Sequence, residues 1–170
     1  GDFVLSSKKY AHWEAMGIEP SEKARAKAEE KGLLLQADFS ELLPHSFDVI
    51  TMWHVLEHVP DVTQEIQIIS KLLKKDGIAV IAVPNYRSWD AQHYKEHWAA
   101  YDVPRHLWHF SKKSIEQLFA KEGFELLAIH PMLFDAFYVS MLSEQYKTGK
   151  KSFLKGRSEE RRVGKECSEP

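Results

Sequence analysis

The sequence has almost no cysteine, no long apolar run and no large excess of either charge. Cys167 is the only cysteine in 170 residues, so no disulfide can form within the chain, which fits a reducing cytoplasm. No apolar run approaches the roughly twenty residues of a membrane span. Lys and Arg number 23 against 25 Asp and Glu, which argues against a basic nucleic-acid-binding face. These absences exclude a disulfide scaffold and a membrane-spanning protein.

The composition that remains is that of a soluble globular protein. Hydrophobic residues make up 44% and charged residues 28%, enough for one domain with a real core. We expect residues 1–145 to form that domain and residues 146–170 to form a polar, disordered tail. The end of the tail, residues 156–170, is as typical of translated cloning sequence as of a natural disordered terminus.

The chain is organised around the stretch Phe47 to Asp61, FDVITMWHVLEHVPD. Its first half is a short apolar run rich in β-forming residues, which predicts a buried strand over 47–52. Three titratable side chains, His54, Glu57 and His58, then crowd the point where the strand ends. Because ligands bind beyond the carboxyl ends of strands in open α/β sheets, this turn is the first place to look for chemistry.

Strand and helix patterns alternate along the chain. The sequence predicts helices over 22–31, 63–74 and 112–122, the first and last capped by Ser21 and Ser111. It predicts strands at 13–18, 33–35, 47–52, 78–83, 124–129 and 134–141. This alternation favours an α/β fold with a doubly wound, mostly parallel sheet.

The spacing His54-x-x-Glu57-His58 matches the H-x-x-E-H motif of inverted zinc proteases. That motif requires one continuous helix, whereas here the first histidine follows a strand and Pro60 comes soon after the second. We therefore assign no metal ligands, and leave open whether Glu57 and His58 hold a metal in another fold or only cap and pack.

Regular periodicity disappears between Tyr86 and Phe110, where aromatic residues and histidines accumulate. A connection this long is usually functional, for example as a lid. His106 and His109 could act as bases near neutral pH, and Arg105 could orient an anionic acceptor. Alternatively, Arg105 and Asp102 only pair with each other to fix the loop. A stacked aromatic loop could also bind a nucleobase, which the absence of a basic field disfavours.

Two acidic residues follow predicted strands. Glu19 lies where nucleotide-binding α/β units place an acidic residue that accepts hydrogen bonds from ribose hydroxyls, and Asp38 could accept one from an adenine amino group. On spacing alone, an exposed glutamate before a helix explains Glu19 equally well, and for Asp38 a simple loop aspartate is the commoner interpretation.

Several motifs taken together, and in this order, resemble the class I S-adenosylmethionine-dependent methyltransferases, especially the ubiquinone-biosynthesis-type O-methyltransferases. The likeness covers about residues 1–129. The motifs are GIEPS at 17–21, FDVITMWHVLEHVPD at 47–61, LLKKDGIAVIAVPN at 72–85 and DVPRHLWHFS at 102–111.

The resemblance implies a Rossmann-like, three-layer αβα sheet and S-adenosylmethionine as cofactor. It implies that Gly1 ends the cofactor loop, that Glu19 binds the ribose, that Asp38 and Phe39 contact the adenine, and that His54 lines the methionine side. The acceptor would be a small molecule that is methylated at oxygen, and residues 86–110 would form its pocket. His106, His109 and His58 are then the catalytic candidates.

The family's first strand and most of its glycine-rich loop would precede Gly1 and are missing from this chain. We therefore expect the 170-residue polypeptide to be poorly stable and to bind the cofactor weakly or not at all. A nicotinamide-dependent oxidoreductase and a non-catalytic Rossmann-like binding domain are the alternatives. The sequence identifies neither the acceptor nor the oligomeric state.

Overall fold

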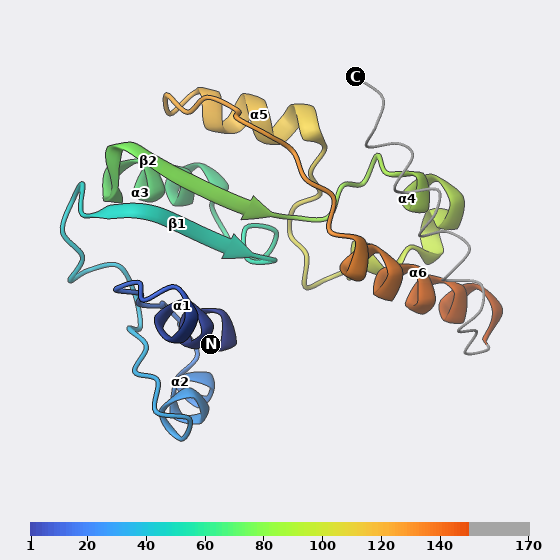
Figure 1. Ribbon diagram of the computed structural model, residues 1–170. Coiled ribbons are helices and arrows are strands. Elements are labelled where there is room, and N and C mark those ends of the chain that lie inside the picture. The colour runs from blue at the N-terminus through green and yellow to red at the C-terminus, as the bar shows by residue number, and fades with distance from the viewer. Residues whose placement is uncertain (150–170) are drawn as a thin grey trace. The chain divides into compact units, whose positions relative to one another are not determined.

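The structure is a computed structural model that describes residues 1–149 (Figure 1). The chain divides into two compact units, unit 1 (Gly1–Ser46) and unit 2 (Phe47–Pro170). None of the helices formed by residues 1–149 is both long and apolar enough to cross a lipid bilayer.

Unit 1 contains two helices, α1 (Asp2–Tyr10) and α2 (Glu22–Glu29). Ser21 caps α2 as predicted, because its hydroxyl accepts a hydrogen bond from the backbone N–H of Ala24. Gly32 follows the helix at φ +75°, a left-handed conformation that glycine adopts without steric cost.

The two strands predicted in unit 1 are wrong beyond a single pair of residues. Ile18 and Gln36 form one parallel bridge, and the segments 13–18 and 33–35 are otherwise irregular. Leu33 is buried, but Leu34 is 76% exposed. A parallel strand is stable when it pairs with strands on its edges and both faces of the sheet are covered. Among the described residues, no third strand lies beside this pair.

Unit 2 is built on two parallel strands joined by a helix. Its elements, in chain order, are β1 (Phe47–Trp53), α3 (Val62–Leu72), β2 (Leu73–Ala82), α4 (Trp89–Tyr94), η1 (Lys95–His97), η2 (Ala99–Tyr101), α5 (Lys112–Ala120) and α6 (Leu133–Thr148). The register runs from Val49 opposite Ile78 to Trp53 opposite Ala82. This βαβ arrangement confirms the predicted strands at 47–52 and 78–83 and the helix between them.

The boundary between α3 and β2 differs from the prediction. Lys74, the last residue of the predicted helix, lies in β2 and pairs with Asp48 of β1 at 2.7 Å. Asp61 caps the start of α3, because its carboxylate accepts a hydrogen bond from the N–H of Gln64 at 3.0 Å.

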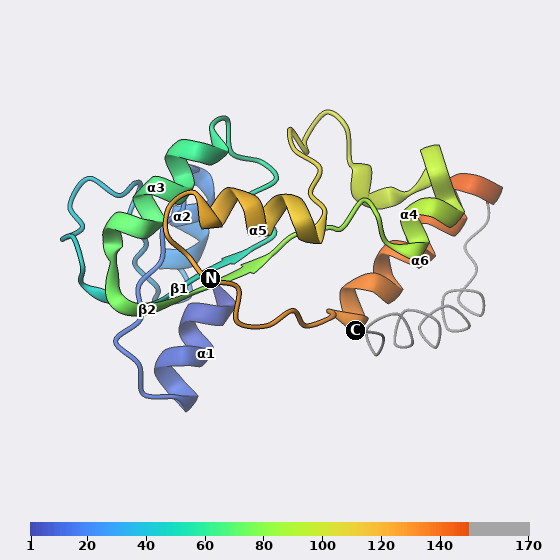
Figure 2. The same ribbon diagram turned by 90° about the horizontal axis from the view of Figure 1, so that it is seen from above.

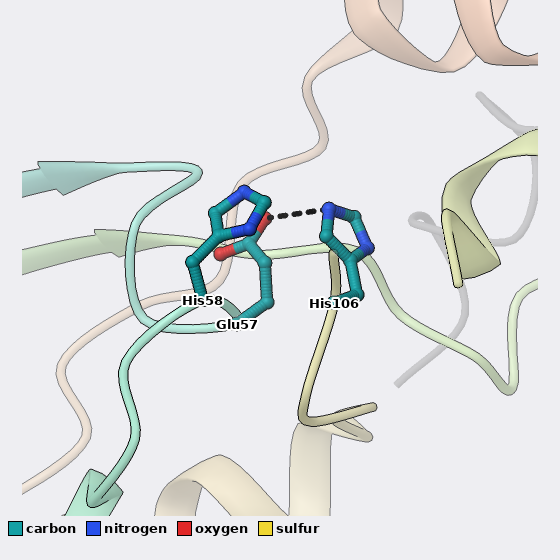
Figure 3. Close-up of side chains that lie close together, drawn as sticks. All are labelled: Glu57, His58 and His106. Carbon is teal, nitrogen blue, oxygen red and sulfur yellow. Dashed lines mark ion pairs between the residues drawn. The ribbon is translucent and has the colours of Figure 1, made fainter. Parts of the chain in front are cut away.

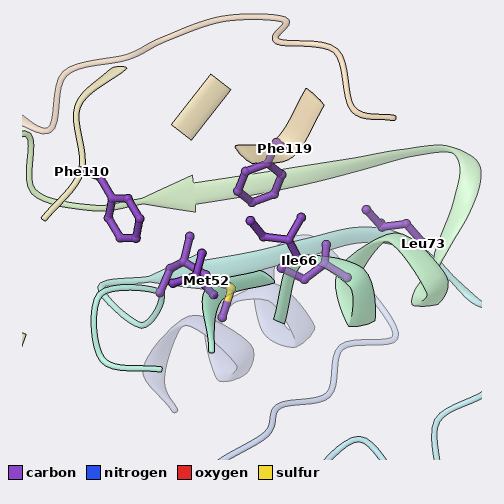
Figure 4. Packing of buried hydrophobic residues seen from close by; sticks show 8 residues of the cluster. Met52, Ile66, Leu73, Phe110 and Phe119 are labelled. Atoms are coloured by element: carbon purple, nitrogen blue, oxygen red, sulfur yellow. The ribbon is translucent and has the colours of Figure 1, made fainter. Parts of the chain in front are cut away.

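The main core lies where α3 and α5 pack on the sheet (Figures 2 and 4). Ser111 caps α5 as predicted, in a reciprocal pair of hydrogen bonds with Ser114. The buried residues of this core are Met52, Leu56, Val62, Ile66, Ile69, Leu73, Phe110 and Phe119. Leu56, which is fully buried, ties the turn after β1 to this core.

A second, smaller core forms in the aromatic segment. Its buried residues are Ala91, Tyr94, Trp98 and Ala100. Helix α6 packs against α4, η1 and η2. Ser143 accepts a hydrogen bond from the N–H of Ala99 at 2.8 Å, and Ser140 donates to Asp90 at 2.7 Å. The long connection is therefore an ordered, partly helical layer.

The two last predicted strands are wrong. Residues 124–130 have no regular secondary structure, and 134–141 lies within α6. The buried side of α6 is polar, with Ser140, Ser143 and Glu144 at helical spacing, so the apolar residues gave no helical period. Helix α6 extends to Thr148, into the expected polar tail, and the tail from residue 150 onward lies outside the described residues.

Candidate functional site

The His54-x-x-Glu57-His58 motif forms a turn after β1, and not a helix. His54 has a left-handed φ of 54° and still donates its backbone N–H to the carbonyl of Ala82 in β2. The N–H of His58 donates to the carbonyl of Val55, which closes the turn. The continuous helix required by the inverted zinc-protease motif is therefore not present here.

Glu57 is the buried centre of this turn, with a side chain only 1% exposed. Its carbonyl oxygen accepts hydrogen bonds from the N–H groups of Leu107 and Trp108, at 2.8 and 3.3 Å. The indole N–H of Trp108 also donates to the carbonyl of Val59 at 2.8 Å. These bonds dock the loop that carries His106 against the turn, although some fifty residues separate them in the sequence.

Glu57, His58 and His106 form a compact cluster of ligand-type atoms (Figure 3). One such atom from each residue lies within 4.8 Å of the other two. The Nε2 atom of His106 is 4.0 Å from Oε1 of Glu57 and 3.8 Å from the carboxylate of Asp102. Glu57 is buried, His106 is half-buried and His58 is exposed, so the cluster reaches solvent at His58.

The hydrogen bonds of both rings leave the same nitrogen available. Nδ1 of His58 lies 3.0 Å from the carbonyl oxygen of Arg105, and Nδ1 of His106 lies 2.8 Å from that of Ala100. A carbonyl oxygen only accepts, so we assign the hydrogen to Nδ1 in each neutral ring and a lone pair to each Nε2. Among the described residues, Oε2 of Glu57 is buried without a hydrogen-bond partner. The cluster thus gathers acceptors and no donor.

His54 lies between two carboxylates. Its Nδ1 is 3.2 Å from Oε1 of Glu57, and its Nε2 is 3.0 Å from Oδ2 of Asp135 at the start of α6. The hydrogen bond with Glu57 raises the pKa of His54 to about 9, helped by the bond with Asp135 and opposed by burial. At neutral pH His54 is therefore an imidazolium that donates to both carboxylates.

We predict that the ring of His54 titrates near pH 9 in chelator-treated protein, measured by NMR of its ring protons. This pKa is raised above the ordinary 6.5, so the protonated ring of His54 stabilises the folded protein. That contribution to the free energy of unfolding is complete below about pH 6.5 and is lost as the pH rises through about 9. A midpoint near 6.5 would contradict the assigned contacts.

His109 and Arg105 lie beside the cluster. Nε2 of His109 is 3.1 Å from the carbonyl oxygen of Tyr101, and its ring centroid is 6.5 Å from that of His106. Arg105 pairs with Asp102 at 2.6 Å, which supports the simpler of the two roles considered for Arg105. Of the three catalytic candidates, the structure brings His58 and His106 together and leaves His109 one ring further away.

Unit 1 carries four of the residues expected to bind the cofactor. Glu19 and Asp38 follow the two extended segments that meet at the single bridge of this unit. The carboxylate of Glu19 accepts a hydrogen bond from the N–H of Ser21 at 2.9 Å. Hydrogen bonds from the hydroxyl and the N–H of Ser40 lower the pKa of Asp38. Both carboxylates are thus held in defined orientations within their turns.

The surroundings of Asp38, Phe39 and Gly1 can also be described. Asp38 lines a small open pocket of about 180 Å³ together with Gln36, whose side-chain oxygen is buried without a hydrogen-bond partner among the described residues. Phe39 is half-buried in the same turn. Gly1 precedes α1, and a Cβ there would lie 3.2 Å from the side chain of Leu33. The cofactor roles of these residues stay predictions.

Sequence reasoning missed Asp135. No signal could have found it, because it lies 81 residues from His54 and in a segment that read as a strand. Asp102 was considered only as a partner of Arg105, although its other oxygen also faces His106.

Comparison with known families decides the class of protein. The model of the family described as a methyltransferase domain matches residues 2–129. The chain belongs to this methyltransferase family. The resemblance read from the sequence is thereby confirmed.

Ubiquinone biosynthesis O-methyltransferases of several bacteria are similar to part of this methyltransferase-family chain. The one from Vibrio cholerae is 43% identical over 68 residues, 36% of this chain and 28% of the relative. The one from Histophilus somni is 36% identical over 86 residues, 44% of this chain and 36% of the relative. The one from Neisseria meningitidis is 42% identical over 48 residues, 28% of this chain and 20% of the relative. The matches span between 20% and 36% of these relatives' lengths.

Solved structures confirm the predicted fold class. A SAM-dependent methyltransferase of Thermotoga maritima, described as a possible histamine N-methyltransferase, has a TM-score of 0.56 at 24% identity, covering 65% of this chain and 55% of its own. The YcgJ protein of Bacillus subtilis has a TM-score of 0.54 at 20% identity, covering 87% and 66%. At these identities the likeness shows the fold, which is the Rossmann-like α/β fold of the methyltransferase family.

Proposed function

We propose that this chain belongs to an S-adenosylmethionine-dependent methyltransferase that methylates an oxygen atom of a small molecule. The observation that carries this proposal is the acceptor-only cluster of Glu57, His58 and His106, at the carboxyl end of β1. The sulfonium methyl group is already activated, but a hydroxyl acceptor must lose its proton. The relatives that are similar in sequence are named ubiquinone biosynthesis O-methyltransferases, which supports oxygen as the acceptor atom.

The cofactor roles proposed for unit 1 follow the family pattern. Glu19 accepts hydrogen bonds from the ribose hydroxyls, and Asp38 and Phe39 contact the adenine. Gly1 is the last glycine of the loop that binds the cofactor. Hydrogen bonds from Ser21 and Ser40 already orient the carboxylates of Glu19 and Asp38. These two side chains therefore lose little conformational freedom when a ligand binds.

We also propose that the cluster holds a divalent cation, which the sequence alone left undecided. The residues fit one: two imidazole nitrogens and a carboxylate converge, each ring donates its other N–H to a backbone carbonyl, and Oε2 of Glu57 is buried without a partner. Mixed nitrogen and oxygen donors suit Zn²⁺, Fe²⁺ or Mn²⁺. A cation here would supply charge that lowers the pKa of a hydroxyl bound beside it.

The ordered segment from Tyr86 to Phe110 is the proposed acceptor side. It supplies His106 to the cluster and His109 beside it, on a layer with its own buried core. His109 is a second group that could take a proton from the acceptor. The partner we propose is a small-molecule acceptor and not a nucleic acid. We propose that the reaction takes place in the cytoplasm.

The test is equilibrium binding of S-adenosylhomocysteine to two proteins. One is the present chain, and the other, called the restored chain, is this chain with the first strand and glycine-rich loop of a family member joined before Gly1. We expect micromolar binding by the restored chain and little or none by the present chain.

Binding by both chains would support the methyltransferase and contradict the predicted need for the first strand. Binding by neither would overturn the proposal and favour a non-catalytic domain. Binding of a nicotinamide dinucleotide, without binding of S-adenosylhomocysteine, would favour the oxidoreductase alternative. The family match does not support that alternative.

A further inference from the structure

The contacts of His54 connect α6 to the cluster. Asp135 lies in the first turn of α6, and its carboxylate is 3.0 Å from Nε2 of His54. The other ring nitrogen is 3.2 Å from Oε1 of Glu57. An imidazole is a rigid plane, so fixing one nitrogen fixes the direction of the other. The position of Asp135 therefore sets where His54 meets Glu57.

Glu57 needs such a partner. Its carboxylate is buried, and His54 is the partner within hydrogen-bond distance of Oε1, while Oε2 has none among the described residues. A buried carboxylate without a fixed rotamer would present its oxygens to the two histidines in several orientations. Metal sites lose affinity when such an orienting contact is removed.

We propose that Asp135 and His54 are positioning residues that hold the Glu57 carboxylate in the orientation in which it serves the cluster with His58 and His106. This inference rests on the proposed function. It gives His54 a different role from the cofactor contact implied by the family resemblance, because both of its ring nitrogens already face carboxylates within unit 2.

Helix α6, which carries Asp135, also packs against the proposed acceptor side. It contacts α4, η1 and η2, and Ser143 accepts the N–H of Ala99. The helix that positions Asp135 is therefore itself held by the ordered aromatic layer.

The experiment is a double-mutant cycle with Asp135→Asn and His54→Asn in the restored chain. Asparagine suits His54 because it tolerates the left-handed backbone there, yet it is too short to bridge Glu57 and Asp135. The readouts are the Mn²⁺ affinity by isothermal titration and, without metal, the ring ¹⁵N chemical shifts of His106 and His58.

We expect each single variant to weaken Mn²⁺ binding by about 10- to 100-fold and to shift the His106 ring signals. In the His54→Asn background, Asp135→Asn should add little, because its effect passes through the ring. This background also controls for the loss of an acidic residue from the first turn of α6. Asp135→Glu, which keeps the charge, should restore part of the affinity.

Independent effects of the two substitutions, or unchanged affinity in both, would overturn the positioning role while leaving the cation site intact. If the unchanged protein bound no Mn²⁺, the cation proposal would fail separately. The metal-free signals would then decide: a shift of the His106 ring on Asp135→Asn only when His54 is present supports positioning, and no shift overturns it.

Discussion

Replacing Glu57 with glutamine is expected to lower the affinity for Mn²⁺ or Zn²⁺ by more than the roughly 10- to 100-fold that is typical when only an orienting partner of a ligand is lost. Glutamine has the same shape and keeps the backbone carbonyl that receives Leu107 and Trp108, so the docked loop should remain. What it removes is the negative charge among three converging ligand atoms. The measurement is isothermal titration of the chelator-treated restored chain.

The matched control is Glu125→Gln, the same chemical change at an exposed position. We expect it to bind the cation like the unchanged protein. Circular dichroism melting of both variants separates a lost ligand from a lost fold. Equal cation affinity in Glu57→Gln and Glu125→Gln would refute the cation site and leave the histidines as direct bases.

Replacing His106 with alanine is expected to lower the turnover of methyl transfer by about 10²- to 10⁴-fold, because the acceptor hydroxyl would lose its proton at the cluster to which His106 contributes a nitrogen. Its Nε2 faces the cluster and its Nδ1 is held by the carbonyl of Ala100. The affinity for S-adenosylhomocysteine should change little. The measurement is transfer of labelled methyl groups to a panel of hydroxyl-bearing small molecules by the restored chain.

His109→Ala is the companion variant, because His109 is in the same loop but outside the cluster. We expect a smaller loss of turnover and unchanged Mn²⁺ affinity. A larger loss in His109→Ala than in His106→Ala would move the proton-transfer role to His109. Unchanged turnover in both variants would overturn the acceptor role proposed for this segment.

Local features of the fold could be read from the sequence because neighbours in the chain decide them. The caps at Ser21 and Ser111 satisfy backbone donors only a few residues away. The strand at 47–52 and the turn after it follow from a short apolar run and the polar residues that end it. The family, too, was recognisable from motifs that lie within continuous stretches.

The strands of unit 1 and the last helix could not be read in this way. The apolar run at 33–35 has strand propensity, but a strand exists only where a partner pairs with it, and here one bridge forms. Helix α6 hides a polar face against α4 and η2, so the sequence shows the apolar residues of its exposed side. In both cases contacts with residues that are distant in the chain, and not local preference, decide the secondary structure.

The sequence by itself determined the residue types of the candidate site: histidines and a glutamate after a strand, and further histidines in a long aromatic connection. The tertiary structure decided which of them act together. It brought His106 to Glu57 and His58, kept His109 apart, and placed Asp135 against His54. The physical reason is that hydrogen bonds from Leu107 and Trp108 to Glu57, and the packing of α6, join segments whose separation in the chain carries no local signal.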